Sequence, residues 1–320
     1  MPSIDELVYD IYHEDEPIEP LNFNTGRQSL ENPLVEIPEL VNNWVRVGDI
    51  SLLVGFGGVG KSTIALNLAL SLASGIDFIG YKVSNAERVA YLDLEMGQYE
   101  FRSRLNLLLE QCPEIARDNF YWACLSNFNI KDRRNETRLK DALAKIKPKL
   151  LIIDNHASFH AGDPNREGEM MTNVVNPFRE IMSEFNLGIL YLMHTPWTEK
   201  ERPRGTVALF DAAATAVAVI RPQADIRRLK WTKRRSVRSD MGETEIEIGY
   251  NAEKHIVYKA TSKVMDEILM EIDLPAKRST LAKHIAEALD IDKSGAYRRI
   301  RTMVKDEILM ETINGLIDKQ

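Results

Sequence analysis

The sequence predicts an α/β protein with a doubly wound, mainly parallel sheet, followed by a smaller module of helices. From Trp44 onward, apolar strand patterns alternate with helical patterns, and a glycine-rich turn joins one strand to its helix. Near residue 262 the composition shifts, and helical patterns then follow one another. Because parallel neighbours need a crossover between them, the alternation predicts right-handed crossovers with helices on both faces of the sheet.

The sheet elements can be assigned in chain order. The predicted strands are Ile50–Val54, Arg88–Leu94, Phe120–Leu125, Leu150–Asp154 and Gly188–Met193, and the helices are Ser62–Ser74, Tyr99–Gln111, Glu136–Lys147 and Met170–Phe185, the last interrupted by Pro177. Later apolar runs have no helical pattern between them, which predicts antiparallel strands that extend the sheet. These runs are Thr215–Ile220, Leu229–Thr232, Thr244–Ile248 and Ile256–Lys259.

The flanking segments differ from the sheet domain, for which we predict residues 37–262. Residues 1–36 form a polar leader with several prolines, in which Ile4, Leu7, Val8 and Ile11 have helical spacing. This leader either docks on a neighbour or is a poorly ordered tail. Residues 263–320 predict helices over Lys263–Ile272, Ser279–Leu289 and Ser294–Val304, then a small hairpin around Asn314-Gly315.

Composition sets limits on the class of protein. The 320 residues are 44% hydrophobic and 28% charged, with a net charge of −7. This acidic balance does not suggest nucleic-acid binding, although a local basic patch would decide that question. Cys112 and Cys124 lack partners at metal-ligand spacing and are expected to be reduced packing residues. With no secretory signal and no apolar run long enough for a membrane span, we expect a soluble, cytoplasmic protein.

A phosphate-binding loop is predicted between the first strand and the first helix. Residues 55–63 read Gly-Phe-Gly-Gly-Val-Gly-Lys-Ser-Thr, the G-x-x-x-x-G-K-[ST] pattern in a strand–turn–helix context. Glycines let successive backbone N–H groups converge on phosphate oxygens at the helix N-terminus. A chance glycine-rich turn is disfavoured by the length and context of the match. The predicted ligands are ATP and Mg²⁺, bound by Gly57, Gly58, Val59, Gly60, Lys61, Ser62 and Thr63, with Lys61 on the β- and γ-phosphates and Ser62 on the metal.

Two other strands end in carboxylates. Asp154 closes the buried run Leu151-Ile152-Ile153, where it could hold the water shell of Mg²⁺. Asp93 and Glu95 close the second strand of the alternating pattern. Glu95 could accept a proton from the water that attacks the γ-phosphate, but a solvated strand-end acid explains it equally well from the residues alone.

Together these motifs resemble the RecA-like ATPases, and most closely the RepA-type plasmid helicases and the DnaB-type replicative helicases. The residues that carry the resemblance are the glycine-rich loop, Leu94-Glu95-Met96, Leu151–Asp154, Ala161–Asn165, Leu192–Thr195 and Arg204-Gly205-Thr206. The resemblance covers roughly residues 35–260 and implies a RecA-like fold, with Glu95 as the catalytic base. It also implies that His194 senses the γ-phosphate, whereas Thr195 replaces a second histidine that is usual in these families.

A basic stretch lies near the end of the resemblance. Between Arg227 and Arg238 there are seven basic residues and no acid. From the residues alone, this is either a solvated basic strand or a contact to a phosphate backbone. Its resemblance to DnaB-type and RadA-like enzymes implies that Lys233 and Arg235 reach the ATP of a neighbouring subunit, and therefore a homo-oligomer, expected to be a hexamer. Arg104, in the helix after Glu95, is a candidate for stacking on adenine.

The C-terminal module has the pattern of a winged helix-turn-helix domain. Its second helix carries a basic stripe and is the predicted recognition helix for DNA. The stripe consists of Lys293, Arg298, Arg299, Arg301 and Lys305, and the predicted core consists of Ala282, Ile285, Ala286, Leu289, Ile300 and Val304. The alternative is a winged helix that contacts proteins.

These features predict an ATP-dependent DNA-binding motor, a homohexameric helicase of the plasmid or viral replication type. The other prediction is an ATP-gated DNA-binding regulator, or a RadA-like recombinase paralogue, that does not unwind DNA. A translocating ring needs basic loops around its channel, and Pro196–Arg204 is a candidate loop. Its basic residues Lys200, Arg202 and Arg204 are diluted by Glu199 and Glu201.

Overall fold

The structure is a computed structural model that describes most of the chain. The described residues are 23–32, 37–126, 128–154, 167–195, 207–221, 226–235, 243–250, 256–260, 269–270, 272–289, 293–305, 309–312 and 314–319. The chain divides into two compact units, Met1–Glu36 and Ile37–Gln320. In the first unit, the short helix α2 (Gly26–Glu31) has a capping box between Thr25 and Gln28 and buries none of its residues. The apolar positions of the predicted docking segment lie outside the described residues.

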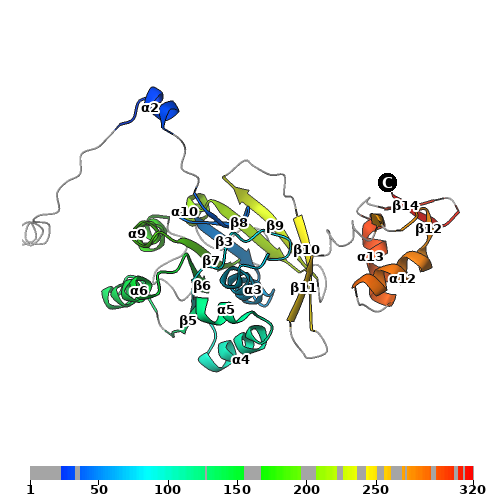
Figure 1. Ribbon diagram of the computed structural model, residues 1–320, viewed down its shortest axis with the longest axis horizontal. Coiled ribbons are helices and arrows are strands. Elements are labelled where there is room, and N and C mark those ends of the chain that lie inside the picture. Colours follow the sequence, from blue (N-terminus) through cyan, green and yellow to red (C-terminus); the bar gives the residue numbers. More distant parts are fainter. Residues whose placement is uncertain are drawn as a thin grey trace, which may run out of the picture. The chain divides into compact units, whose positions relative to one another are not determined.

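A nine-stranded sheet forms the centre of the second unit. Its strands are β3 (Ile50–Gly55), β4 (Val89–Asp93), β5 (Phe120–Cys124), β6 (Leu150–Asp154), β7 (Gly188–His194), β8 (Thr215–Ile220), β9 (Ile226–Arg234), β10 (Glu243–Tyr250) and β11 (Ile256–Ala260). They lie in the order β11-β10-β9-β8-β3-β7-β6-β4-β5 (Figure 1). The strands from β8 to β5 in this order are parallel, and β9, β10 and β11 pair antiparallel.

Helices cover both faces of this sheet, as Figure 1 shows. The helices α3 (Lys61–Ser74), α4 (Gln98–Leu109) and α5 (Glu114–Asn119) share one apolar core with the sheet, and α6 (Arg133–Ile146), α9 (Asn176–Phe185) and α10 (Val207–Ala212) share the other. Successive side chains of β3 alternate between them, with Leu53 in the first core and Leu52 and Val54 in the second. The mainly parallel sheet with helices on both faces is the predicted doubly wound α/β architecture.

One predicted strand direction is wrong. The run Thr215–Ile220 forms β8, which pairs parallel with β3 instead of extending the sheet antiparallel. The reason is α10, which precedes β8 and belongs to the crossover that a parallel neighbour requires. This six-residue helix is too short to produce a recognisable helical period. The antiparallel prediction is correct for β9, β10 and β11.

Several smaller elements differ from the prediction. The predicted helix from Met170 to Phe185 consists of α8 (Glu167–Met170), a π-helical turn η1 (Met171–Val175) and α9. Pro177 lies in the first turn of α9, directly after this π-helical turn. Helix α5 and the two short strands before β3, which are β1 (Glu39–Val41) and β2 (Val45–Arg46), were not predicted.

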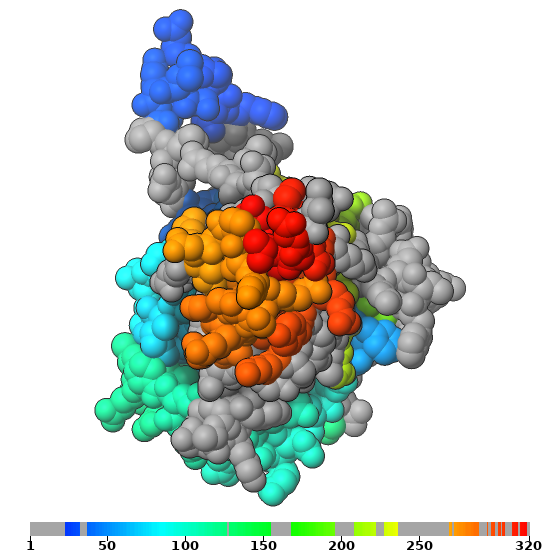
Figure 2. All heavy atoms as spheres, turned by 90° about the vertical axis from the view of Figure 1, so that its right-hand side faces the viewer, coloured from blue at the N-terminus to red at the C-terminus, as the bar shows by residue number. Residues whose placement is uncertain are grey.

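The C-terminal residues form a small module with its own core. It contains β12 (Ala276–Lys277), α12 (Arg278–Leu289), α13 (Lys293–Lys305), β13 (Leu309–Glu311) and β14 (Leu316–Lys319), with the strands in the order β12-β14-β13. Its atoms, orange to red in Figure 2, pack as one compact group. Among its buried side chains are the predicted core residues Ala282, Ile285 and Ile300. The hairpin of β13 and β14 occurs where predicted, with Gly315 at φ 71° in its turn.

Some predictions about this module stay open. Residues 263–268 and 271 of its first predicted helix lie outside the described residues. The winged-helix class and the domain limits at residues 262 and 263 stay predictions. Within the described parts of the whole chain, no helix is both long enough and apolar enough to cross a membrane.

Candidate active site

Four neighbouring parallel strands bring the candidate residues to one edge of the sheet. In the order β3, β7, β6, β4, these strands end at Gly55, His194, Asp154 and Asp93. Gly55 is in register with His194, and Asp93 is in register with Asp154. Because ligands of open α/β sheets bind beyond the carboxyl ends of the strands, this edge is the expected binding site.

The loop after β3 has the backbone geometry of a phosphate cradle. Gly58 and Gly60 have φ angles of 73° and 99°, which strongly favour glycine. Gly60 is the N-cap of α3, so the first N–H groups of the helix have no partner within it and point toward the loop. Gly57 and Gly58 are exposed, while Ser62 and Thr63 are half-buried. A helix N-terminus behind an open glycine loop suits an anion with several oxygens.

Lys61 is poised over this loop. Its Nζ donates to the carbonyl oxygens of Gly55 at 2.9 Å and Phe56 at 3.1 Å, and lies 3.2 Å from Nδ1 of His194. Burial lowers the pKa of Lys61, and the charges of Asp154 and Glu95 oppose this shift. Lys61 is only 5% exposed, and its ammonium group can exchange the two carbonyl oxygens for phosphate oxygens.

Asp154 fits a magnesium site. It is 1% exposed, and its Oδ2 accepts a 2.8 Å hydrogen bond from the Tyr91 hydroxyl. Burial raises the pKa of Asp154, and the nearby Ser62 hydroxyl opposes this shift. Among the described residues, Oδ1 of Asp154 has no hydrogen-bond partner. A buried oxygen left open beside a hydroxyl is the donor set that Mg²⁺ takes in P-loop enzymes. Tyr91, which the sequence reasoning missed, orients this carboxylate.

A second buried carboxyl lies beside Asp154. Asp93 is 0% exposed, and its Oδ2 accepts a 3.0 Å hydrogen bond from the Met96 backbone N–H. Burial and the charge of Asp154 raise the pKa of Asp93 to about 7. Burial, together with Asp93, raises the pKa of the neighbouring Cys124 thiol to about 12. Asp93 therefore titrates near neutral pH directly beside the site.

This buried acid predicts a pH-dependent stability. Because the pKa of Asp93 is raised on folding, the native state binds its proton more tightly than the unfolded chain does. The titration of Asp93 should thus lower the free energy of unfolding by about 2 kcal/mol as the pH rises from about 5.5 to about 8. In Asp93→Asn, urea unfolding without nucleotide or Mg²⁺ should show a much smaller change over this range. An unaltered pH dependence in this variant would contradict the assignment.

Glu95 and His194 lie on the solvent side of the site. The side chain of Glu95 is 48% exposed, and its Oε2 lies 3.8 Å from Nε2 of His194. His194 therefore stands between Glu95 and Lys61. A carboxylate that is open to water at this position could act as a general base. The two roles predicted for Glu95, catalytic base and solvated acid, both agree with its exposure.

Lys233 and Arg235 lie at the other end of the sheet. Lys233 Nζ donates to the carbonyl oxygens of Phe210 at 2.6 Å and Asp211 at 2.9 Å, and Arg235 also donates to the Asp211 carbonyl. Arg235 N–H donates to Ala214, whose own N–H donates to Ile50 at the start of β3. Five strand residues at about 3.3 Å each place this pair roughly 17 Å from the phosphate loop of the same chain.

A register shift decides which way these basic side chains point. Ala216 pairs with Lys233 and Val217 with Trp231, which leaves Thr232 as an extra residue in β9. Trp231 packs against the core on the α3 face, whereas Lys233 lies over the Phe210 ring on the α10 face, with its Nζ 5.1 Å from the ring centre. Without the extra residue, alternation would place both on the same face.

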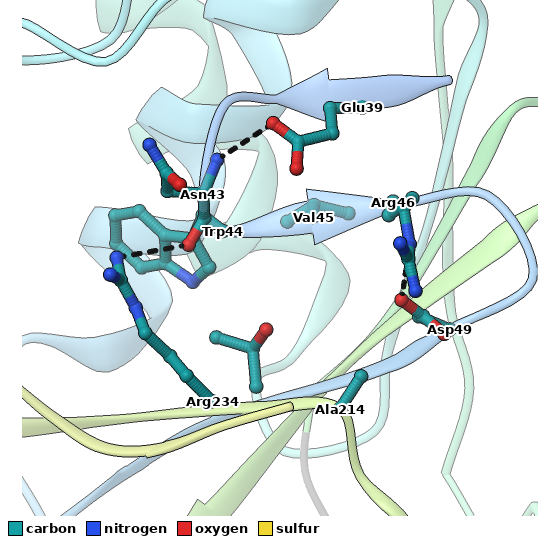
Figure 3. A pocket seen from close by; sticks show the side chains of 9 residues that line it. Glu39, Asn43, Trp44, Val45, Arg46, Asp49, Ala214 and Arg234 are labelled. Carbon is teal, nitrogen blue, oxygen red and sulfur yellow. Dashed lines mark hydrogen bonds and ion pairs between the residues drawn. The ribbon is translucent and has the colours of Figure 1, made fainter. Parts of the chain in front are cut away.

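Arg234, between the two candidate cations, faces a small cavity instead (Figure 3). Its guanidinium lies 5.3 Å from the Trp231 ring centre and donates to the Asn43 carbonyl at 3.4 Å. The cavity is lined by Glu39, Asn43, Trp44, Val45, Arg46, Asp49, Ala214, Thr215 and Arg234, and has a volume of about 30 Å³. This is space for roughly one water molecule, so the cavity is too small for a nucleotide.

The other described candidates are not brought to this site. Arg104 is exposed on α4, and no described contact relates it to a base. On α13, Lys293 and Arg301 are exposed and share one helix face with the exposed Tyr297. The side chains of Arg298, Arg299 and Lys305 lie outside the description, as do Ala161–Asn165 and the candidate channel loop Pro196–Arg204.

Comparisons with known proteins place the chain in a family. The model of the AAA domain matches residues 14–200, which is more than half of the chain. Among solved structures, a KaiC-like protein from the hyperthermophilic archaeon Pyrococcus horikoshii OT3 matches with a TM-score of 0.48 and 16% identity, covering 70% of this chain and 99% of that one. A comparison with curated proteins finds no match.

The glycine loop, Lys61, Ser62 and Asp154 define a candidate P-loop nucleotide site. The chain belongs to the AAA domain family. This family and the geometry of the glycine loop both support nucleotide binding. The predicted site lies within or directly beside the matched range, except for Lys233, Arg235 and the C-terminal module, which follow it.

Proposed function

We propose that the protein is an ATP-driven DNA motor of the hexameric helicase kind, in which each nucleotide is hydrolysed between two subunits. The observation that carries the proposal is the placement of Lys233 and Arg235. Both cations lie at the amino end of the sheet, while the P-loop lies at the carboxyl end. They are out of reach of the nucleotide of their own chain. A neighbouring copy, stacked head to tail, could receive them at its own P-loop.

Each residue of the site has a different role in the proposed hydrolysis. The N-terminus of α3 and Lys61 would bind the phosphates, and Ser62 and Asp154 would hold the metal. Bound Mg²⁺ would neutralise charge on the β- and γ-phosphate oxygens. Glu95 accepts the proton of the attacking water. Since His194 lies within 3.8 Å of both Lys61 and Glu95, it would respond when Lys61 moves onto a γ-phosphate.

The cations from the neighbour complete the site. In the transition state, negative charge spreads over the γ-phosphoryl oxygens, and a cation delivered at that moment stabilises it. Burial and the adjacent Arg235 lower the pKa of Lys233, so this lysine is already held in a partly desolvated position. The carbonyl groups that now bind both side chains are neutral and can be exchanged for phosphate oxygens. Hydrolysis would then depend on assembly.

The DNA contact is proposed for α13. Between Lys293 and Lys305 the helix has five basic residues and no acid, although the chain as a whole is acidic. Ala296, Ile300 and Met303 face the module's own core, so the opposite face is available to a partner. On that face, the exposed Lys293 and Arg301 could contact DNA phosphates.

This interface predicts a specific salt dependence. Exchanging Lys293 and Arg301 together for Ala should weaken binding to duplex DNA and reduce the slope of log affinity against log salt by about one for each phosphate that the variant no longer neutralises. Lys283→Ala, on the exposed part of α12, removes one charge from the same module and serves as the control. Binding would be measured by fluorescence anisotropy at several salt concentrations. An unchanged slope in the double variant would remove α13 from the DNA interface.

A further inference from the structure

The outward-facing carbonyl groups of the P-loop need partners of their own. When successive N–H groups of a loop converge on a ligand, the carbonyl oxygens point away from it and into the protein. Those of Gly55 and Phe56 are bound by Lys61. The carbonyl of Val59 is bound by a residue 168 positions further along the chain, Arg227, whose Nε lies 2.5 Å from it. Nothing in the hydrolysis scheme uses this arginine.

The contact between Arg227 and the Val59 carbonyl is buried and lies where ordering the loop costs the most entropy. Arg227 is 8% exposed and Val59 is 5% exposed. Val59 stands between Gly58 and Gly60, which both hold positive φ angles. Glycine gives the free chain many other conformations at these positions, so ordering the loop costs more entropy there than elsewhere. A charged hydrogen bond to the peptide between them is well placed to offset that cost.

Arg227 is also held rigidly. It lies in β9, which is hydrogen-bonded on both sides, and is in register with Ile246 of β10. Two residues further along β9, Leu229 is in register with Val219 of β8 and is fully buried. The donor therefore stands on a fixed part of the sheet next to the P-loop. A support of this kind can set the position of a loop to within a fraction of an ångström.

We propose that Arg227 is a positioning residue for nucleotide binding, which keeps the P-loop in its phosphate-binding conformation through the Val59 carbonyl. Apparent affinity falls in proportion to the fraction of molecules that hold the competent conformation. Removing this hydrogen bond should therefore weaken ATP and ADP alike, with little effect on turnover at saturating ATP. The inference rests on the nucleotide site of the proposed function and is independent of the DNA-motor assignment.

Two neutral substitutions of similar size separate the hydrogen bond from the charge. Gln carries an amide nitrogen at the same number of bonds from the backbone as Nε of Arg, whereas Met has the same length and no donor. In calorimetric titrations, Arg227→Met should bind ADP about tenfold more weakly than the wild type, the loss expected for a hydrogen bond to a charged group. Arg227→Gln should stay within about threefold of the wild type.

The outcomes decide the proposal. Wild-type affinity in Arg227→Met would overturn it, and so would an equal loss in both variants, because the donor would then be irrelevant. A lower melting temperature with unchanged affinity would assign Arg227 to the fold alone. If Arg227→Met does not fold, the ADP affinity of Arg227→Gln decides the proposal. An affinity near that of the wild type would support it, and a tenfold loss would overturn it. A wild-type protein that binds no nucleotide would instead refute the nucleotide site itself.

Discussion

Glu95→Gln should abolish most of the ATP hydrolysis while leaving ATP binding intact. The amide keeps the size of the side chain but cannot accept a proton from water. Loss of a general base typically costs about 10²- to 10⁴-fold in rate, so turnover should fall by this amount. Since Lys61, Ser62 and Asp154 are the residues proposed to bind the phosphates and the metal, the dissociation constant for ATP should change by less than about threefold. Single-turnover hydrolysis and calorimetric binding measure the two quantities separately.

Glu100→Gln is the matched control for this variant. Glu100 is an exposed acid in the first turn of α4, close to Glu95 in the sequence. Its replacement by Gln is the same chemical change, made outside the site. It should hydrolyse ATP at the wild-type rate. Wild-type turnover in Glu95→Gln would show that Glu95 is the solvated strand-end acid and that another group activates the water.

Arg235→Ala should remove the DNA-stimulated hydrolysis and spare nucleotide binding. A cation supplied in trans to a phosphoryl group is worth about 10³- to 10⁵-fold in rate, which is the largest effect expected of any side chain here. Arg235 is exposed and bonded to the Asp211 carbonyl, so its removal should hardly alter the free energy of unfolding. The rate would be measured with DNA at saturating ATP. A rate near that of the wild type would exclude Arg235 from the reaction.

Mixing two inactive variants tests whether the cation acts between subunits. Arg235→Ala retains Glu95, and Glu95→Gln retains Arg235. In a mixed oligomer, the ATP site of an Arg235→Ala subunit retains Glu95 and can receive Arg235 from a neighbouring Glu95→Gln subunit. Such a site is complete, and activity should reappear. If Arg235 acts within its own chain, no combination restores a complete site and the mixture stays inactive. Each variant mixed with itself is the control.

The central part of the site could be predicted because its signals are local. The P-loop lies in consecutive residues, and the predicted loop and the predicted end of α3 at Ser74 both agree with the structure. Likewise, Leu150–Asp154 reads as a buried strand and forms β6 with these same bounds. In both cases one stretch of chain carries the strand pattern and the functional residue together.

What could not be predicted depends on contacts between distant segments. The partner of Arg227 is a backbone carbonyl, which has no sequence signature. The contacts of Tyr91 and Asp93 with Asp154 become visible only when β4 and β6 lie side by side. The direction of β8 depends on a crossover with a very short helix. The extra residue at Thr232 follows from the pairing of β8 with β9, yet it decides which face Lys233 takes.

The most direct test of the account is the rate of ATP hydrolysis measured without DNA, with single-stranded DNA and with duplex DNA, at one fixed salt concentration because basic contacts weaken with salt. A motor that assembles on DNA and delivers Lys233 and Arg235 between subunits should hydrolyse ATP much faster with single strands than without DNA. The stimulation should disappear in Arg235→Ala. A rate that is the same in all three conditions, with duplex affinity that changes with the bound nucleotide, would contradict the motor and identify an ATP-gated regulator.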